Sequence, residues 1–170
     1  MRYRLRYREE SQSVWREILR DSETLTATEY QWNTSAVPDG YYVVAVEASD
    51  ELSNPDGLTL RSSSESEPML VDNHPPSVSA LTFGGGRVRG TATDAMGPVA
   101  RLEAAIDGGE WRVIFPDDDL LDTREESFAI DVSALAPGSH IVAVRAIDGG
   151  GNQAASEITV TVAGAVARAR

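Results

Sequence analysis

The sequence predicts an all-β protein that contains two tandem copies of one β-sandwich domain. Apolar and polar residues alternate along many short segments, which is the pattern of half-buried strands. Gly, Pro, Asn and Asp residues separate these segments at short intervals, and no stretch keeps a helical period. An internal repeat completes the evidence, because Trp15-Arg16-Glu17-Ile18 returns as Trp111-Arg112-Val113-Ile114 and Val44-Ala45-Val46 returns as Val142-Ala143-Val144. A repeat of this length indicates a duplicated small domain.

The second copy contains signals for seven strands, with a turn signal after each of the first six. We expect these strands at residues 78–83, 87–93, 99–106, 111–115, 127–132, 140–147 and 157–162. Gly84-Gly85-Gly86, Asp107-Gly108-Gly109 and Gly149-Gly150-Gly151 mark three of the turns. Seven short strands at this spacing are typical of a β-sandwich of the immunoglobulin type.

The first copy begins later in the repeat than the second copy. Its first alternating segment, Tyr3 to Tyr7, corresponds to the third strand of the second copy, so two strands have no counterpart. In a sandwich, those strands would lie beside the strand that carries Tyr30 and Trp32. Their absence would expose roughly 400 Å² of apolar surface, or about 10 kcal/mol, which is close to the whole stability of a small domain. We expect the missing strands to come from upstream sequence, with Met1 a misplaced start or the chain a C-terminal fragment, or from a partner chain, including a homodimer.

The predicted border between the copies lies at Val71-Asp72-Asn73-His74-Pro75-Pro76, where two prolines indicate a short and stiff link. We expect a partial domain with strands three to seven over residues 1–73, a complete domain over residues 74–163, and a disordered tail over residues 164–170. The segment from Asn54 to Ser66 is longer than its counterpart in the second copy and rich in turn residues. It is expected to form a protruding loop.

Composition excludes several classes of function. The chain of 170 residues has a formal net charge of −12 and a pI near 4.5, which argues against binding to nucleic acids or to anionic membrane surfaces. All 15 basic residues are arginine, which excludes chemistry that needs a lysine. The absence of cysteine excludes disulfides, thiolate metal sites and cysteine nucleophiles. No apolar run approaches the roughly 20 residues of a membrane span.

The segment from Val37-Pro38-Asp39-Gly40-Tyr41-Tyr42 into the following Val-rich stretch resembles fibronectin type III and related bacterial Ig-like domains. Together with Trp32-Asn33-Thr34 and the border motif, it is similar to the Ig-like C-terminal tails of exported bacterial β-propeller proteins. The resemblance covers nearly the whole chain, although His140 stands where the first copy has its corner tyrosine, Tyr42. It implies a non-catalytic structural or protein-interaction module, in an extracellular or periplasmic part of a larger exported protein. An ancillary carbohydrate-binding sandwich is the alternative.

Acidic and amide side chains are expected near the border, because chain entry and two of the loops lie at one end of such a domain. The five candidates are Asp39, Asp72, Asn73, Asp94 and Asp148. Calcium takes six to eight oxygen ligands of this kind. The spacing nevertheless matches no defined calcium loop, and Asp and Asn ordinarily close turns through bonds to the backbone. We therefore predict turn-closing roles, with calcium binding as the alternative and no other cofactor.

The remaining candidates are interpreted structurally. Trp15 and Trp111 occupy matched positions, which indicates packing, whereas a sugar platform would need at least two coplanar rings on one open face. Four arginines alternate along the first strand and are expected on a solvated face beside glutamates: Arg2, Arg4, Arg6 and Arg8. A hydrolase would need a pair such as His140 and an acid within a cleft, and no motif supports one. We therefore predict no enzymatic activity.

Overall fold

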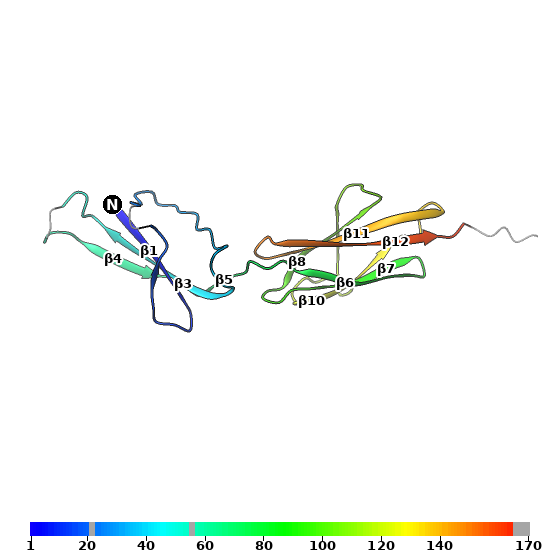
Figure 1. The fold of residues 1–170 in the computed structure, drawn as a ribbon, viewed down its shortest axis with the longest axis horizontal. Coiled ribbons are helices and arrows are strands. Elements are labelled where there is room, and N and C mark those ends of the chain that lie inside the picture. Colours follow the sequence, from blue (N-terminus) through cyan, green and yellow to red (C-terminus); the bar gives the residue numbers. More distant parts are fainter. Residues whose placement is uncertain (21–22, 55–56, 165–170) are drawn as a thin grey trace, which may run out of the picture. The chain divides into compact units, whose positions relative to one another are not determined.

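The computed structural model describes residues 1–20, 23–54 and 57–164, and within these ranges every regular element is a β-strand (Figure 1). The prediction of an all-β fold is confirmed. The chain divides into two compact units, Met1–Asn73 and His74–Arg170. Apart from residue 164, the predicted tail lies outside the described residues.

The second unit is a sandwich of two antiparallel sheets. Its strands are β6 (Ser77–Gly84), β7 (Arg87–Thr93), β8 (Val99–Ile106), β9 (Arg112–Ile114), β10 (Glu125–Asp131), β11 (Gly138–Asp148) and β12 (Gln153–Val162). One sheet has the order β10-β7-β6 and the other has the order β12-β11-β8-β9. All seven strands expected from the alternation are present. This division into a three-stranded and a four-stranded sheet is the fibronectin type III-like arrangement.

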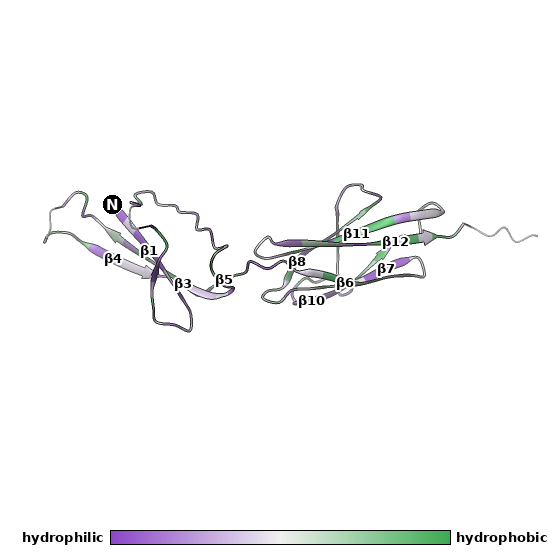
Figure 2. Cartoon of the chain, in the orientation of Figure 1, coloured by the Kyte–Doolittle hydropathy of each residue, from purple (hydrophilic) through white to green (hydrophobic). Residues whose placement is uncertain are grey.

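The core of the second unit lies between the two sheets. Along β11, apolar residues dominate (Figure 2), and Val142, Val144 and Ala146 are each completely buried because every second side chain points toward the other sheet. Phe128 of β10 enters the same core opposite Gly90 of β7. A Cβ atom at Gly90 would lie 2.7 Å from the Phe128 ring, so the glycine makes room for the aromatic side chain.

The first unit is one antiparallel sheet. Its strands are β1 (Arg2–Glu9), β2 (Arg16–Glu17), β3 (Gly40–Ser49), β4 (Arg61–Glu65) and β5 (Met69–Val71). They follow the order β2-β1-β3-β4, and β5 also pairs with β3. In the described part of this unit, no second sheet faces the first. The buried apolar cluster is accordingly small: Val37, Tyr42 and Val71, with Tyr7 and Trp32 packed against it.

Two expectations for the first unit need correction. The strand expected at Tyr30 and Trp32 is not formed, because its counterpart β10 pairs with β7 and the described part of the first unit offers no such neighbour. The expected loop from Asn54 to Ser66 is partly a strand, since β4 pairs with the open edge of β3 from Ala45↔Glu65 to Ser49↔Arg61. Residues 55–56 of that loop lie outside the described residues.

Candidate functional site

The inner face of β3 is uncovered, although β3 repeats the sequence of β11. Val142 and Val144 of β11 are completely buried, whereas their counterparts Val44 and Val46 are partly exposed and 38% exposed, respectively. At Val44 and Val46 the pattern is the reverse of that in β11, since Val43, on the opposite face of β3, is only 5% exposed. Tyr42, on the same face as Val44, is buried beside Tyr7 and Trp32. The reversal follows from the missing second layer of the first unit.

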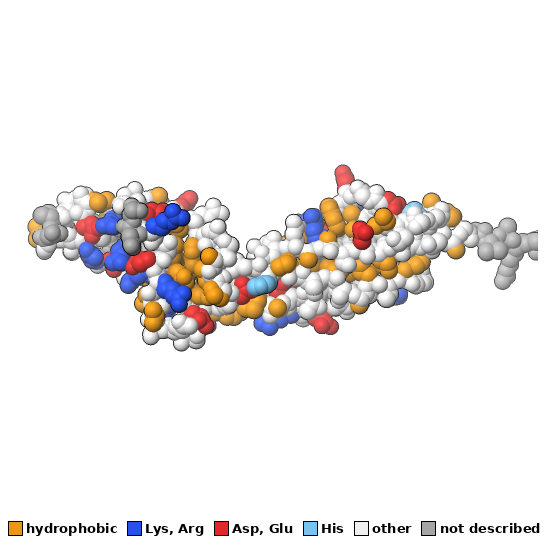
Figure 3. Space-filling view, in the orientation of Figure 1, with side chains coloured by type: hydrophobic (Ala, Val, Ile, Leu, Met, Phe, Trp, Pro, Cys, Tyr) orange, Lys and Arg blue, Asp and Glu red, His pale blue; other side chains and the backbone are white. Residues whose placement is uncertain are grey.

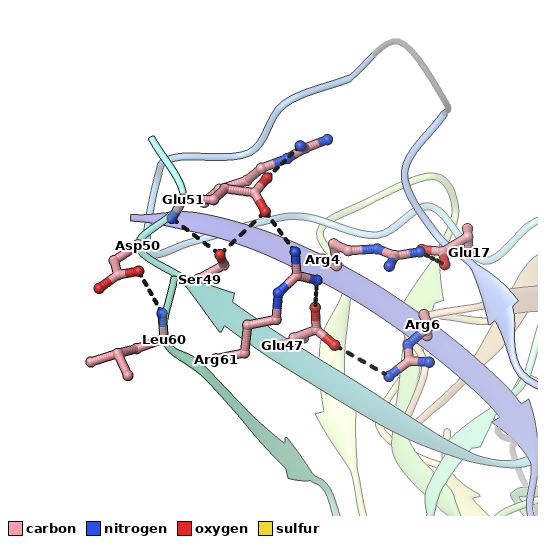
Figure 4. Close-up of polar contacts among 10 residues, drawn as sticks. Arg4, Arg6, Glu17, Glu47, Ser49, Asp50, Glu51, Leu60 and Arg61 are labelled. Atoms are coloured by element: carbon pink, nitrogen blue, oxygen red, sulfur yellow. Dashed lines mark hydrogen bonds and ion pairs between the residues drawn. The ribbon is translucent and has the colours of Figure 1, made fainter. Parts of the chain in front are cut away.

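The opposite face of the sheet is covered by a layer of ion pairs. Arg2 bonds Glu51 at 2.6 Å and Arg4 bonds Glu17 at 2.5 Å. Four further pairs extend the layer: Arg6 with Glu47, Arg8 with Glu65, and Arg61 with both Glu47 and Glu51. Figure 4 shows Arg6 and Arg61 converging on Glu47 across β1, β3 and β4. The prediction that the arginine stripe is paired with glutamates is confirmed.

In this layer the positive charges of the arginines and the negative charges of the glutamates neutralise each other. The hydrogen bond from Arg2 holds the pKa of the Glu51 carboxyl below its ordinary value. The methylene stems of Arg6 and Arg8 lie opposite Ala45 and Val43 in the sheet register, so they cover apolar surface. The layer therefore explains why Val43 is buried.

A groove of about 480 Å³ lies on the uncovered face. Its apolar lining includes Leu5, Ile18, Val46, Met69, Tyr30 and Trp32. Glu29 is the charged residue at this groove, and the lining offers no acid–base pair for catalysis. Hydrophobic side chains also gather at the surface of the first unit in Figure 3. The arrangement is suited to binding by burial of apolar surface.

The tryptophans do not form a sugar-binding platform in the described residues. Trp15 is partly buried with Arg6 and Arg8 over its ring at 5.7 and 5.1 Å, while Trp111 is 38% exposed with Arg145 at 4.4 Å. Both rings are covered by a guanidinium group, which is a cation–π arrangement. Trp32 packs on Tyr7 at 4.7 Å between ring centroids, with the rings tilted by 45°. Packing therefore describes Trp15 and Trp32, whereas Trp111 is more exposed than expected.

Within the first unit, the calcium candidates Asp39, Asp72 and Asn73 form a polar cluster at the end of β5. The Oδ1 atom of Asp39 accepts hydrogen bonds from the backbone N and the Nδ2 atom of Asn73 at 2.9 and 3.2 Å. The same Asn73 amide donates to the carbonyl of Val37 at 2.9 Å. Carboxylate oxygens of Asp39 and Asp72 lie within 4.8 Å of each other. The hydrogen bonds of this cluster hold the corner before β3 against the last residues of the unit.

Within the second unit, Asp94 and Asp148 lie at the ends of β7 and β11. Asp94 accepts hydrogen bonds from the backbone N atoms of Met96 and Gly97, both at 2.8 Å. Asp148 accepts two bonds from Asn152, both at 2.9 Å. Both carboxylates are buried, and their oxygens lie within 4.8 Å of each other. Both carboxylates thus accept hydrogen bonds within the turns that follow their strands, and calcium binding stays a prediction.

His140 occupies the corner of the second unit and has two acceptors. Its Nδ1 atom lies 2.7 Å from Oδ2 of Asp107, and its Nε2 atom lies 2.8 Å from the carbonyl oxygen of Ala136. The hydrogen bond with Asp107 raises the pKa of His140, because it favours the protonated ring. Since Nε2 faces a backbone carbonyl, the ring is not poised to take a proton from a nucleophile. Asp107 was not among the sequence candidates, although the Asp-Gly turn signal places it at the hairpin.

No protein-family model and no curated protein matches the chain. Among solved structures, it is similar to fibronectin(III)-like modules of CbhA from Clostridium thermocellum, with 20% identity and a TM-score of 0.41, over 94% of this chain and 77% of that chain. The fold is fibronectin type III-like. The sheet order of the second unit establishes this, and no function is transferred from the CbhA modules. No helix in the described residues is long and apolar enough to cross a membrane.

Proposed function

We propose that the chain is a non-catalytic structural and protein-interaction module, and that the uncovered face of the first unit is its binding surface. The exposure of Val44 and Val46, whose repeat counterparts Val142 and Val144 are completely buried, supports this proposal. A contiguous apolar groove at a protein surface marks a site of association. Asp94, Asp148 and Asn73 are engaged in turns and corners, whereas the groove leaves apolar side chains of the first unit uncovered.

The module is proposed to act outside the cytoplasm, as part of a larger exported bacterial protein. The support is the resemblance of the Val37–Tyr42 corner and of the border motif to the tails of exported β-propeller proteins. The partner of the first unit is then another polypeptide, or another domain of the same exported protein.

A displayed library of peptides, selected against the whole chain, tests the proposed surface. Enriched peptides should lose binding to a Val46→Arg variant, because a charge in the groove removes the apolar contact. Ile141 provides a matched control, since it is an exposed apolar strand residue of the second unit, at 45% exposure. Ile141→Arg should leave binding intact. Peptides that bind both variants equally would contradict the proposal.

A further inference from the structure

We propose that the groove of the first unit receives a two-stranded antiparallel β-hairpin of a partner protein, and that residues 27–33 become the strand that pairs with it. This inference rests on the proposed function and specifies the partner of the same surface. It concerns a segment whose backbone lacks partners: within the described residues, no backbone hydrogen bond of residues 27–33 is formed. Tyr30 is 39% exposed in this segment. An unpaired backbone beside an apolar groove is a template for strand addition.

The second unit shows what fills the equivalent space. Residues 27–33 align with β10, which pairs with β7 from Glu125↔Thr93 to Asp131↔Arg87. β7 in turn pairs with β6 in the same antiparallel sheet. The hairpin of β6 and β7 thereby supplies the second layer over β8 and β11. The first unit has counterparts of β8 and β11, namely β1 and β3, and its groove lies where that hairpin would pack.

The repeat also specifies the chemistry of the missing hairpin. Phe128 faces Gly90 in the register, and a Cβ atom at Gly90 would lie 2.7 Å from the ring. Because Tyr30 is the counterpart of Phe128, the partner strand needs a glycine opposite Tyr30. Val88 lies opposite Ile130, so an aliphatic residue is expected opposite Trp32, the counterpart of Ile130.

Charge completes the description of the partner strand. Glu29 is the counterpart of Ser127, which faces Thr91. A basic residue at the position opposite Glu29 would form a cross-strand pair of opposite charge. The partner is therefore an alternating hairpin with a central glycine, with apolar residues two positions away from it, and with a basic residue beside it.

A second copy of the chain fits the groove less well than such a partner. It could donate its own β6–β7 hairpin only by uncovering its own core, in which Val88 and Ala92 are completely buried. Two copies could also pair their 27–33 segments with each other in an antiparallel, two-fold symmetric way. If this pairing is centred on Glu29, the two Glu29 carboxylates lie opposite each other, which is unfavourable. A second copy is therefore not the occupant that the groove favours.

A synthetic peptide with the sequence of residues 77–93 provides the probe. Titrated into the whole chain, it should bind saturably and protect the amides of residues 27–33 from hydrogen exchange. A Cβ atom at Gly90 would also lie 2.7 Å from Leu81 of the peptide itself, so all the peptides carry Leu81→Ala. In this background, Gly90→Val should weaken binding at least tenfold, because its side chain would meet the Tyr30 ring. A peptide that carries Gly84→Val is the matched control and should bind normally, since nothing lies within 4 Å of a Cβ atom at Gly84.

A Tyr30→Ala variant of the chain should rescue the binding that Gly90→Val weakens. Removal of the exposed ring should restore binding of the Gly90→Val peptide to within about threefold of the Leu81→Ala peptide that keeps Gly90. Equal binding of the two peptides to the unmodified chain, or binding without protection of residues 27–33, would overturn the hairpin proposal. Formation of a dimer that depends on Val46 would also overturn it, in favour of a second copy. If no hairpin peptide binds, while library peptides bind the chain and lose binding to Val46→Arg, this inference is refuted and the proposed function stands.

Discussion

Tyr42 and His140 show how one position of the repeat performs the same structural task with different chemistry. The Tyr42 hydroxyl donates to the carbonyl oxygen of Pro38 at 2.9 Å, and the His140 ring meets the carbonyl oxygen of Ala136 at 2.8 Å. In both copies the corner side chain reaches back four residues along the chain. The sequence alignment predicts this equivalence. It does not predict that Asp107 binds the other ring nitrogen, because Asp107 belongs to a distant hairpin.

The stability of the second unit should decrease as the pH rises from 5.5 to 8.5. Both partners of His140 are acceptors, so only the doubly protonated ring can donate to Asp107 and Ala136 together. Its pKa in the folded chain is raised above the ordinary value of 6.5 by the hydrogen bond with Asp107. The stabilisation is therefore complete below pH 6.5 and is lost as the pH rises through the folded-state pKa. Urea unfolding, monitored by signals of this unit, measures the change.

His140→Tyr is the matched control, because tyrosine is the residue that the first copy carries at this corner. The variant should keep the corner bond to Ala136 and lose most of the difference between pH 5.5 and pH 8.5. The carboxyl groups of Glu103, Asp107 and Asp131 have lowered pKa values and stay ionised over this interval. An unchanged pH dependence in His140→Tyr would show that another group is responsible.

Gly90→Ala should destabilise the second unit by about 1–3 kcal/mol, the usual cost of overpacking a core. The added Cβ atom would lie 2.7 Å from both Leu81 Cδ2 and the Phe128 ring. Gly84→Ala is the control, because a Cβ atom there meets nothing within 4 Å. Denaturant unfolding of the two variants measures the difference in free energy. Equal stabilities would mean that Leu81 and Phe128 can move aside without cost.

The alternation of apolar and polar residues was sufficient to predict the strands of the second unit. Each of these strands buries one face, so every second residue in its sequence is apolar. It failed for β4, where the sequence from Arg61 to Glu65 has three serines and no apolar position. This segment forms a strand because β3 offers an edge, which is a non-local cause. The failure at Tyr30 and Trp32 is the converse, since a segment with apolar aromatics remains unpaired where the described unit offers no neighbouring strand.

The loops that follow β7 and β11 were predicted correctly as turns, and their carboxylates allow a test of the calcium alternative. Asp94 and Asp148 are buried with carboxylate oxygens within 4.8 Å. Repulsion between two charges at this separation is about 1 kcal/mol even in a dielectric like that of water. Without calcium, Asp94→Asn should therefore raise the melting temperature, because the amide keeps the Oδ1 acceptor and loses the charge.

Millimolar calcium should leave the melting temperature of the unmodified chain unchanged if these carboxylates serve only to close turns. Differential scanning calorimetry in calcium and in a chelator makes the comparison. A rise of several degrees in calcium that disappears in Asp94→Asn would contradict the turn-closing interpretation and identify a calcium site. Gly84→Ala serves again as a control, since it changes neither loop.

The chain as a whole joins two units that share a sequence pattern and differ in how they are held together. The second unit has a core between two sheets, and its largest completely buried side chains include Phe128, Leu102 and Val142. The first unit has a small buried cluster and a surface layer of ion pairs, and exposed ion pairs stabilise a fold only slightly. We expect the first unit to be the less stable of the two, because its described part has one sheet where the second unit has two.

Hydrogen exchange should show this difference directly. In the free chain, amides of β1 and β3 should exchange at least tenfold faster than amides of β8 and β11, because local opening exposes less apolar surface in a single sheet than in a sandwich. Sodium chloride at 1 M should increase exchange in β1 and β3 further, since the ion pairs of Arg2, Arg4 and Arg61 are exposed enough to be screened. Exchange in β8 and β11 should change little, because that core is apolar. Equal protection of the two units from hydrogen exchange would mean that the first sheet is stable without a second layer. The groove would then need no partner to cover its apolar side chains.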